Sequence, residues 1–173
     1  MSGTATVSLG RVRFLADGTW RAKPSGAPAV LIPVHDRDGV AVDIIAYHLD
    51  DPSEWRLRFG DCCPILGAEA LAMAAYHRDP VTLCSTPERW LLARSHPGAG
   101  VHLHHQGGDA ICVLDWGVDL GPLFAGVSHI QCDSVGLHDQ MQRAIRSWEP
   151  EITAPGQNLS PARGFREARH HAA

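Results

Sequence analysis

Polar residues that can hold a metal ion or an anion follow three short apolar runs of the sequence. The runs are residues 81–84, 111–114 and 129–132, and the polar residues after them are Ser85 and Thr86, Asp115, and Asp133. Each run is typical of a short buried strand. If the strands are parallel neighbours, their carboxyl ends meet at one edge of a sheet, where ligands gather in open α/β folds. The sequence therefore predicts that these four residues share a candidate catalytic or binding site.

Helix capping explains part of this set equally well. Thr86 precedes Pro87 and an acidic first turn, which is the pattern of a helix start, and Asp133 or Ser134 precedes a second helix. Asp115 is harder to explain as a cap, because Gly117 follows it closely and disfavours a helix there. Both interpretations, helix cap and ligand site, stay open.

A histidine cluster is the second candidate site. His102 and His104 would lie on one face of a strand, where two imidazoles can begin a transition-metal site. Asp109 or His96 is a nearby further ligand. The alternative is a polar loop beside Gly107-Gly108. Zinc is the metal that this chemistry favours, whereas carboxylates such as Asp115 favour magnesium.

Basic residues gather near the N-terminus and give the third candidate, a nucleic-acid contact. They are Arg11, Arg13, Arg21 and Lys23, with the aromatic residues Phe14 and Trp20 between them. Such a cluster can contact phosphates in a salt-sensitive manner. The alternative is the solvent face of an ordinary amphipathic strand.

The elements that must position these residues fall into two groups. Residues 7–60 predict an antiparallel β-meander: hairpins over 7–24 and 29–49, then a strand over 55–59. Asp36 and Asp38 belong to the turn of the second hairpin.

Residues 61–148 predict strands that alternate with helices. Helices are expected over 65–77, from Thr86, and over 134–148, with strands at 81–84, 110–114 and 128–132. This alternation favours a mostly parallel, layered α/β sheet, so the chain is expected to be one α/β domain over 1–148. Residues 149–173 lose periodicity and predict a flexible tail.

Composition limits the remaining possibilities for the location and the partners of the protein. The 173 residues carry a formal net charge of −4 and five cysteines without paired spacing, which favours a reduced, cytoplasmic protein. No apolar run approaches the roughly 20 residues that span a bilayer, so no membrane partner is expected. The oligomeric state is not predicted.

The order of these motifs resembles that of a known family. The segment AVLIPVHDRDG at 29–39 resembles the segment before the Toprim domain of phage- and plasmid-type primases, where a return strand, a helix and further apolar strands follow, here at 81–84 and 111–115. The chain over 28–148 is also similar to short uncharacterised proteins of bacterial prophages and mobile elements. The motifs that carry this second similarity are WRLRFG at 55–60, ILG at 65–67 and TPERWL at 86–91.

The resemblance implies a Toprim-like fold whose catalytic acids are lost. The resemblance implies a site with a glutamate at the end of the first strand and a D-x-D motif at the end of a later strand. In a Toprim site these acids together hold Mg²⁺. Here the first position falls at Ser85 or Thr86, and the later one reads Asp115-Trp116-Gly117, so one aspartate remains. The primase zinc-ribbon pattern is also missing, since the chain has no C-x-x-C.

The leading hypothesis is therefore a non-catalytic, Toprim-like domain without a cofactor, which binds DNA or acts as an accessory in mobile-element DNA metabolism. One alternative is a Mg- or Zn-dependent hydrolase or nuclease that uses Asp115, Asp133 or the histidines at 102–105. Another is a protein-interaction module.

Overall fold

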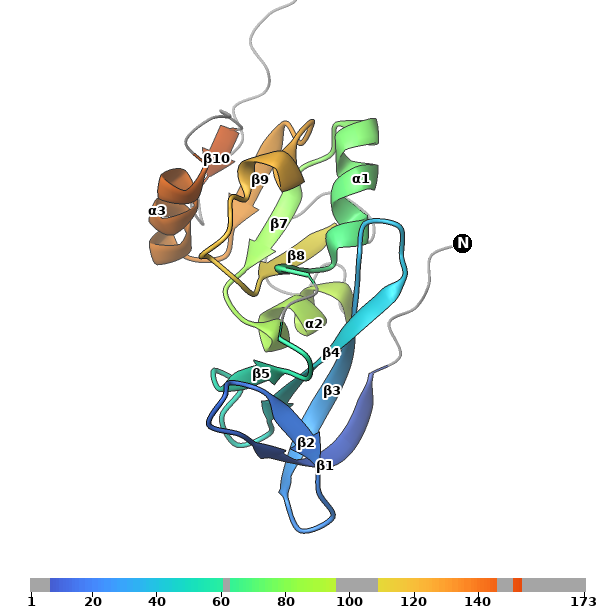
Figure 1. Cartoon of the computed structure of the whole chain (residues 1–173). Helices are drawn as coiled ribbons and strands as arrows, with labels where there is room; N and C mark the ends of the chain where they lie inside the picture. The colour runs from blue at the N-terminus through green and yellow to red at the C-terminus, as the bar shows by residue number, and fades with distance from the viewer. Residues whose placement is uncertain (1–6, 61–62, 96–108, 146–150, 154–173) are drawn as a thin grey trace, which may run out of the picture.

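Over the part of the chain that is described, the protein is a mixed α/β structure with two separate β-sheets and three α-helices (Figure 1). The structure is a computed structural model that describes residues 7–60, 63–95, 109–145 and 151–153. The segment at 100–105, which was predicted as a strand or an extended loop, lies outside these ranges.

The first sheet is antiparallel, as the sequence predicted for residues 7–60. Its strands are β1 (Ser8–Phe14), β2 (Trp20–Ala22), β3 (Ala27–His35), β4 (Ala41–His48) and β5 (Trp55–Leu57). Their order is β2-β1-β3-β4-β5, so the prediction of a simple meander was wrong: β3 pairs with β1 and leaves β2 at the edge.

Gly26 allows the chain to turn after β2 and to pair β3 with the edge of β1 that β2 leaves free. A Cβ at this position would lie 2.3 Å from the carbonyl oxygen of Val12, so only glycine lets the backbone pass this close.

The first sheet curls until its two edges touch. Thr19, just before β2, forms a parallel bridge with Leu57 of β5, and the Trp20 Nε1–H donates to the Ile44 carbonyl at 3.0 Å. The concave face encloses a small cluster of buried side chains: Val12, Trp20, Ala29 and Ala46. Side chains on the other face of β1 and β2 therefore point outward.

The second sheet contains the predicted parallel strands. Its order is β10-β9-β7-β8-β6, in which β10, β9, β7 and β8 run parallel and β6 pairs antiparallel with β8. The bounds are β6 Ile65–Leu66, β7 Val81–Cys84, β8 Ala110–Val113, β9 His129–Cys132 and β10 Glu151–Thr153. Two of these strands correct the sequence analysis: residues 65–66 were assigned to a helix, and residues 151–153 to a flexible tail.

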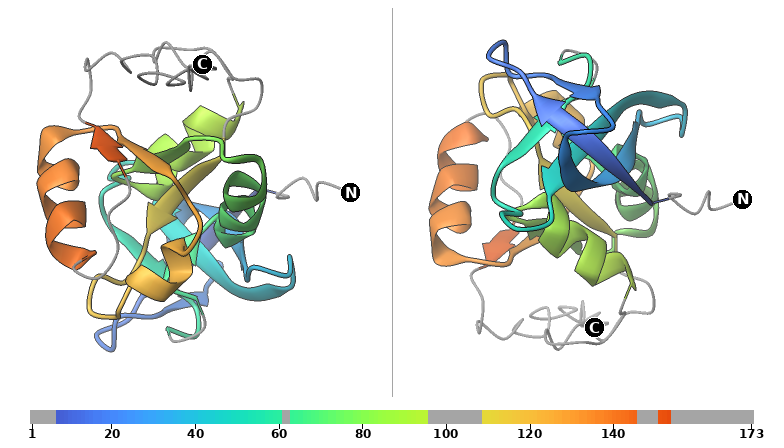
Figure 2. Two further views of the ribbon diagram at one scale, coloured as in Figure 1. Left: turned by 90° about the horizontal axis from the view of Figure 1, so that it is seen from above. Right: turned by 90° about the horizontal axis from the view of Figure 1, so that it is seen from below.

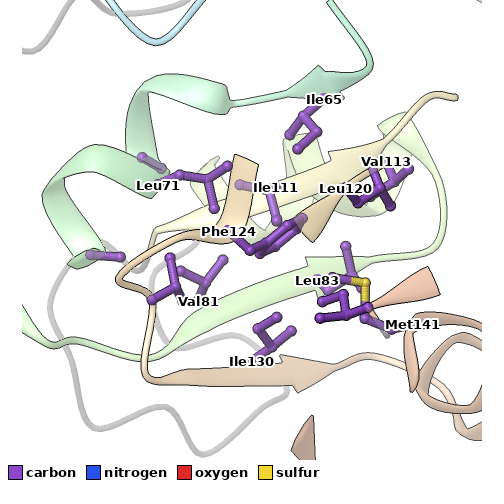
Figure 3. Packing of buried hydrophobic residues seen from close by; sticks show 14 of the residues in the cluster. Ile65, Leu71, Val81, Leu83, Ile111, Val113, Leu120, Phe124, Ile130 and Met141 are labelled. Carbon is purple, nitrogen blue, oxygen red and sulfur yellow. The ribbon is translucent and has the colours of Figure 1, made fainter. Parts of the chain in front are cut away.

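Helices cover both faces of the second sheet (Figure 2). They are α1 (Ala68–His77), α2 (Pro87–Ser95) and α3 (Val135–Ala144), with the 3₁₀ turn η1 at Gly121–Phe124. Side chains of α1, η1 and α3, among them Leu71, Phe124 and Met141, pack on one face (Figure 3). The opposite face packs against α2 and the first sheet.

A buried cluster joins the two sheets. Val30 and Ile32 of β3 and Tyr47 of β4 share it with Trp90 of α2 and Cys112 of β8. Because apolar side chains from both sheets fill one core, the first sheet has a fixed position on the second.

The direction in which the chain crosses the second sheet reverses at its centre. The chain passes from β7 through α2 to the neighbouring β8, and then crosses back through η1 to β9 on the other side of β7. Right-handed crossovers put α2 on one face and η1 and α3 on the other, as observed. In such sheets the crevice at the carboxyl ends of the two central strands, here β7 and β9, is the usual binding position.

Candidate functional site

Two of the predicted residues meet at the carboxyl ends of β7 and β9. The Asp133 Oδ2 accepts hydrogen bonds from the Ser85 backbone N–H at 2.8 Å and from the Ser85 Oγ–H at 3.0 Å. The Asp133 N–H donates in turn to the Leu83 carbonyl at 3.0 Å. Asp133 therefore joins the ends of two strands and is not a helix cap.

The Asp133 carboxylate is nearly buried, with a side chain that is 9% exposed. The Arg89 Nε lies 3.9 Å from Oδ2, but that arginine is 60% exposed, so solvent weakens the pair. Oδ1 is buried and has no hydrogen-bond partner among the described residues. A carboxylate held in this way positions the strand ends.

Two other hydroxyl residues near this contact, Thr86 and Ser134, are helix caps. The Thr86 Oγ accepts from the Arg89 N–H at 3.2 Å at the start of α2, and the Ser134 Oγ accepts from the Leu137 N–H at 3.3 Å at the start of α3. For Thr86 and Ser134, the capping interpretation accounts for the residue.

Asp115 lies at the same sheet edge but in a separate turn. Its Oδ1 accepts from the Gly117 N–H at 2.7 Å, which closes an Asx turn after β8. The parallel pairing of β8, β7 and β9 thus confirms the shared edge, although Asp115 and Asp133 bond to different partners there.

Asp109 lies at the opposite end of β8, where its backbone carbonyl accepts from the Thr82 N–H at 3.0 Å. Burial raises the pKa of its carboxyl group, and the charge of Asp79 raises it further. The proposed histidine partners, His102 and His104, lie outside the described residues. Within the described ranges, no three His, Cys, Asp or Glu side chains are grouped so that they could hold a metal ion.

The four basic residues share the outer face of the β1–β2 hairpin, here called the basic face. Arg13 of β1 lies directly opposite Arg21 of β2, and the Lys23 N–H donates to the Arg11 carbonyl at 3.0 Å, which places Lys23 opposite Arg11. All four side chains are exposed. The hairpin lies at the end of the molecule opposite α1 and α3 (Figure 1).

The two aromatic residues predicted to lie among these cations point the other way. Phe14 stacks on His48, with ring centroids 4.0 Å apart, and Trp20 is 2% exposed on the concave face. Side chains alternate along a strand, so a residue next to an outward arginine points inward. Neither ring is part of the basic face.

A different aromatic residue, missed by the sequence analysis, lies exposed beside the hairpin. Phe59 is 63% exposed, and the Arg58 guanidinium lies 5.5 Å from its ring centroid and 5.3 Å from that of Trp20. The bridge between Thr19 and Leu57 brings this segment to the start of β2. No local pattern could reveal the contact, because it joins residues about 40 positions apart.

Comparisons of the chain with family models, with curated proteins and with solved structures give no match. Among the described helices, none has the length and apolar character needed to cross a membrane. Inferences about function therefore rest on the geometry of the chain itself.

Proposed function

We propose that this protein binds nucleic acid through the basic face of the β1–β2 hairpin, as a non-catalytic accessory domain in DNA metabolism. The observation that carries the proposal is the arrangement of Arg11, Arg13, Arg21 and Lys23 as two cross-strand pairs of like charge. None of the four forms an ion pair with a carboxylate within the described part of the chain.

Such an arrangement is unfavourable without a partner, because like charges directly opposite each other destabilise a strand pair. Phosphate groups would relieve the repulsion and release counterions from the nucleic acid. The chain as a whole has a formal net charge of −4, so this concentration of positive charge is local. A local basic patch on an acidic protein favours one defined binding surface.

A Toprim-like relationship belongs to this proposal as an expectation. The parallel strands β7 to β10 with helices on both faces support it, as does Asp115, two residues after the end of β8. Ser85 or Thr86 stands where the resemblance implies a catalytic glutamate. The hydrolase alternative has weaker support, because one carboxylate oxygen of Asp115 and one of Asp133 accept hydrogen bonds that fix the backbone, which leaves Oδ1 of Asp133 as the buried oxygen there without a partner among the described residues. No described feature favours the protein-interaction alternative over nucleic-acid binding.

Fluorescence anisotropy with labelled DNA over a series of salt concentrations tests the proposal. If all four cations contact phosphates, the logarithm of the affinity should fall with that of salt concentration with a slope of about −3. The double variant Arg13→Gln/Arg21→Gln should bind more weakly and reduce the slope by about 1.5.

A matched control removes two arginines elsewhere. Arg37 in the β3–β4 turn and Arg143 on α3 are both exposed, so Arg37→Gln/Arg143→Gln changes the net charge equally. The control should bind like the wild type. Equal losses in both double variants would mean that overall charge, and not the basic face, drives binding.

A further inference from the structure

Phe59 is held in an exposed position by a buried carboxylate. The side chain of Asp43, a residue that is 3% exposed, accepts from the backbone N–H groups of Arg58 at 3.0 Å, Phe59 at 3.2 Å and Gly60 at 3.2 Å. Three charge-assisted hydrogen bonds fix the backbone of this short loop. The loop therefore presents an apolar ring to solvent in a defined orientation.

The same loop lies against the hairpin that carries the basic face. A Cβ on Gly60 would lie 3.9 Å from the Thr19 Cγ2, and Thr19 is two residues before Arg21. The Arg58 guanidinium lies near two rings, that of Trp20 on the concave side of the hairpin and that of Phe59 in the loop. The exposed ring thus lies in a loop that contacts the start of β2, the strand that carries Arg21.

We infer that the ligand of the basic face is single-stranded nucleic acid, and that Phe59 stacks against one of its bases while the hairpin cations contact the phosphates. This inference rests on the proposed function and names its substrate class. Bases in a duplex stack on one another and offer no free face, whereas an unpaired base can stack on a phenyl ring. A duplex would therefore use the cations but not Phe59.

Binding of a DNA strand of about 15 nucleotides and of the matching duplex, measured by anisotropy at one salt concentration, tests the inference. The wild type should prefer the single strand. Phe59→Ala should weaken single-strand binding about tenfold and leave duplex binding unchanged. Its salt slope should equal that of the wild type, because the ring contacts no phosphate. Phe59→Trp should retain the affinity.

Two controls make the outcome specific. Tyr76→Ala removes an aromatic ring that is 82% exposed on α1, and it should bind like the wild type. A strand without bases should bind the wild type and Phe59→Ala equally. If Phe59→Ala binds the single strand as well as the wild type does, the stacking role is wrong while the proposed function stands. If the wild type binds neither DNA, both are wrong.

Discussion

Arg13 of β1 and Arg21 of β2 lie directly opposite each other in the antiparallel register, and both side chains are exposed. Arg11 and Lys23 occupy the next pair of outward positions on the same two strands. The inner face of the hairpin contributes to folding through Val12 and Trp20, which are buried. The outer face concentrates positive charge that forms no close ion pair with a described carboxylate, although Asp17 is near enough for its charge to interact with Arg21. This concentration of charge is the basis of the first prediction.

Neutralising one member of the opposed pair should stabilise the free protein at low salt. Arg13→Gln removes the repulsion with Arg21, so its melting temperature should exceed that of the wild type by about 1–2 °C. The difference should shrink at high salt, where screening already weakens the repulsion. Arg37→Gln is the control, and thermal unfolding at two salt concentrations is the measurement. A variant that melts below the wild type at low salt would contradict the prediction.

Removing the carboxylate that joins β7 to β9 should destabilise the second sheet. Asp133→Ala leaves the Ser85 N–H without its acceptor and should lower the free energy of unfolding by about 1–3 kcal/mol. Asp133→Asn keeps an acceptor oxygen and should lie closer to the wild type. Ser85→Ala removes the hydroxyl bond alone, so its cost should be the smallest of the three. Urea unfolding measures each variant, and equal stability of Asp133→Ala and the wild type would show that the contact is dispensable.

Gly67 should tolerate no side chain, for two separable reasons. Its φ is +83°, a left-handed conformation, and a Cβ there would lie 2.6 Å from the Ala110 carbonyl oxygen and 2.7 Å from the Trp90 Nε1. These two atoms form a buried hydrogen bond of 2.8 Å. Gly67→Ala should therefore cost about 3 kcal/mol or more, from left-handed strain and from disruption of that bond.

Gly39 is the matched control for Gly67. Its φ is +78°, but no atom lies within 4 Å of a Cβ at this position. Gly39→Ala should cost only about 1 kcal/mol, which is the strain alone. Urea unfolding of both variants separates the two contributions. Similar losses would show that the close contact at Gly67 relaxes easily.

The buried cysteines should make the protein less stable in alkaline solution. Burial, together with a smaller contribution from the nearby charge of Asp133, raises the pKa of Cys84 and of Cys132 from 9.0 to about 12. Above pH 9 these thiols ionise in the unfolded chain but stay protonated in the folded one. Stability is therefore present below that pH and is lost as the pH rises toward about 12.

The loss should be at most about 1.4 kcal/mol per pH unit for each cysteine. Denaturant unfolding at several alkaline pH values measures it, and Cys84→Ala should show a shallower slope. The native thiols should also react slowly with iodoacetamide at neutral pH, since thiolate is the reactive form. An unchanged slope in Cys84→Ala would show that this thiol does not contribute.

Local patterns in the sequence were sufficient for the elements around the sheet edge. The apolar runs predicted β7, β8 and β9, and their alternation with helices predicted the parallel pairing that brings Ser85 and Asp133 to one edge. Whether Asp133 caps a helix or joins two strands could not be predicted. That depends on the distance between strand ends 48 positions apart, which only the folded sheet defines.

For the basic face near the N-terminus, too, the sequence determined the local pattern and the tertiary structure determined the contacts. The alternation of arginine with Val12 and Phe14 determined which side chains share a face, because the two-residue period of a strand is a local property. The edge to which β3 adds, the bridge from Thr19 to Leu57 and the position of Phe59 beside the hairpin were decided by the tertiary structure. Those features depend on the closure of the curled sheet around Trp20 and on the hydrogen bonds of the Asp43 carboxylate. Both are contacts between residues distant in the sequence, which no local repeat of the sequence encodes.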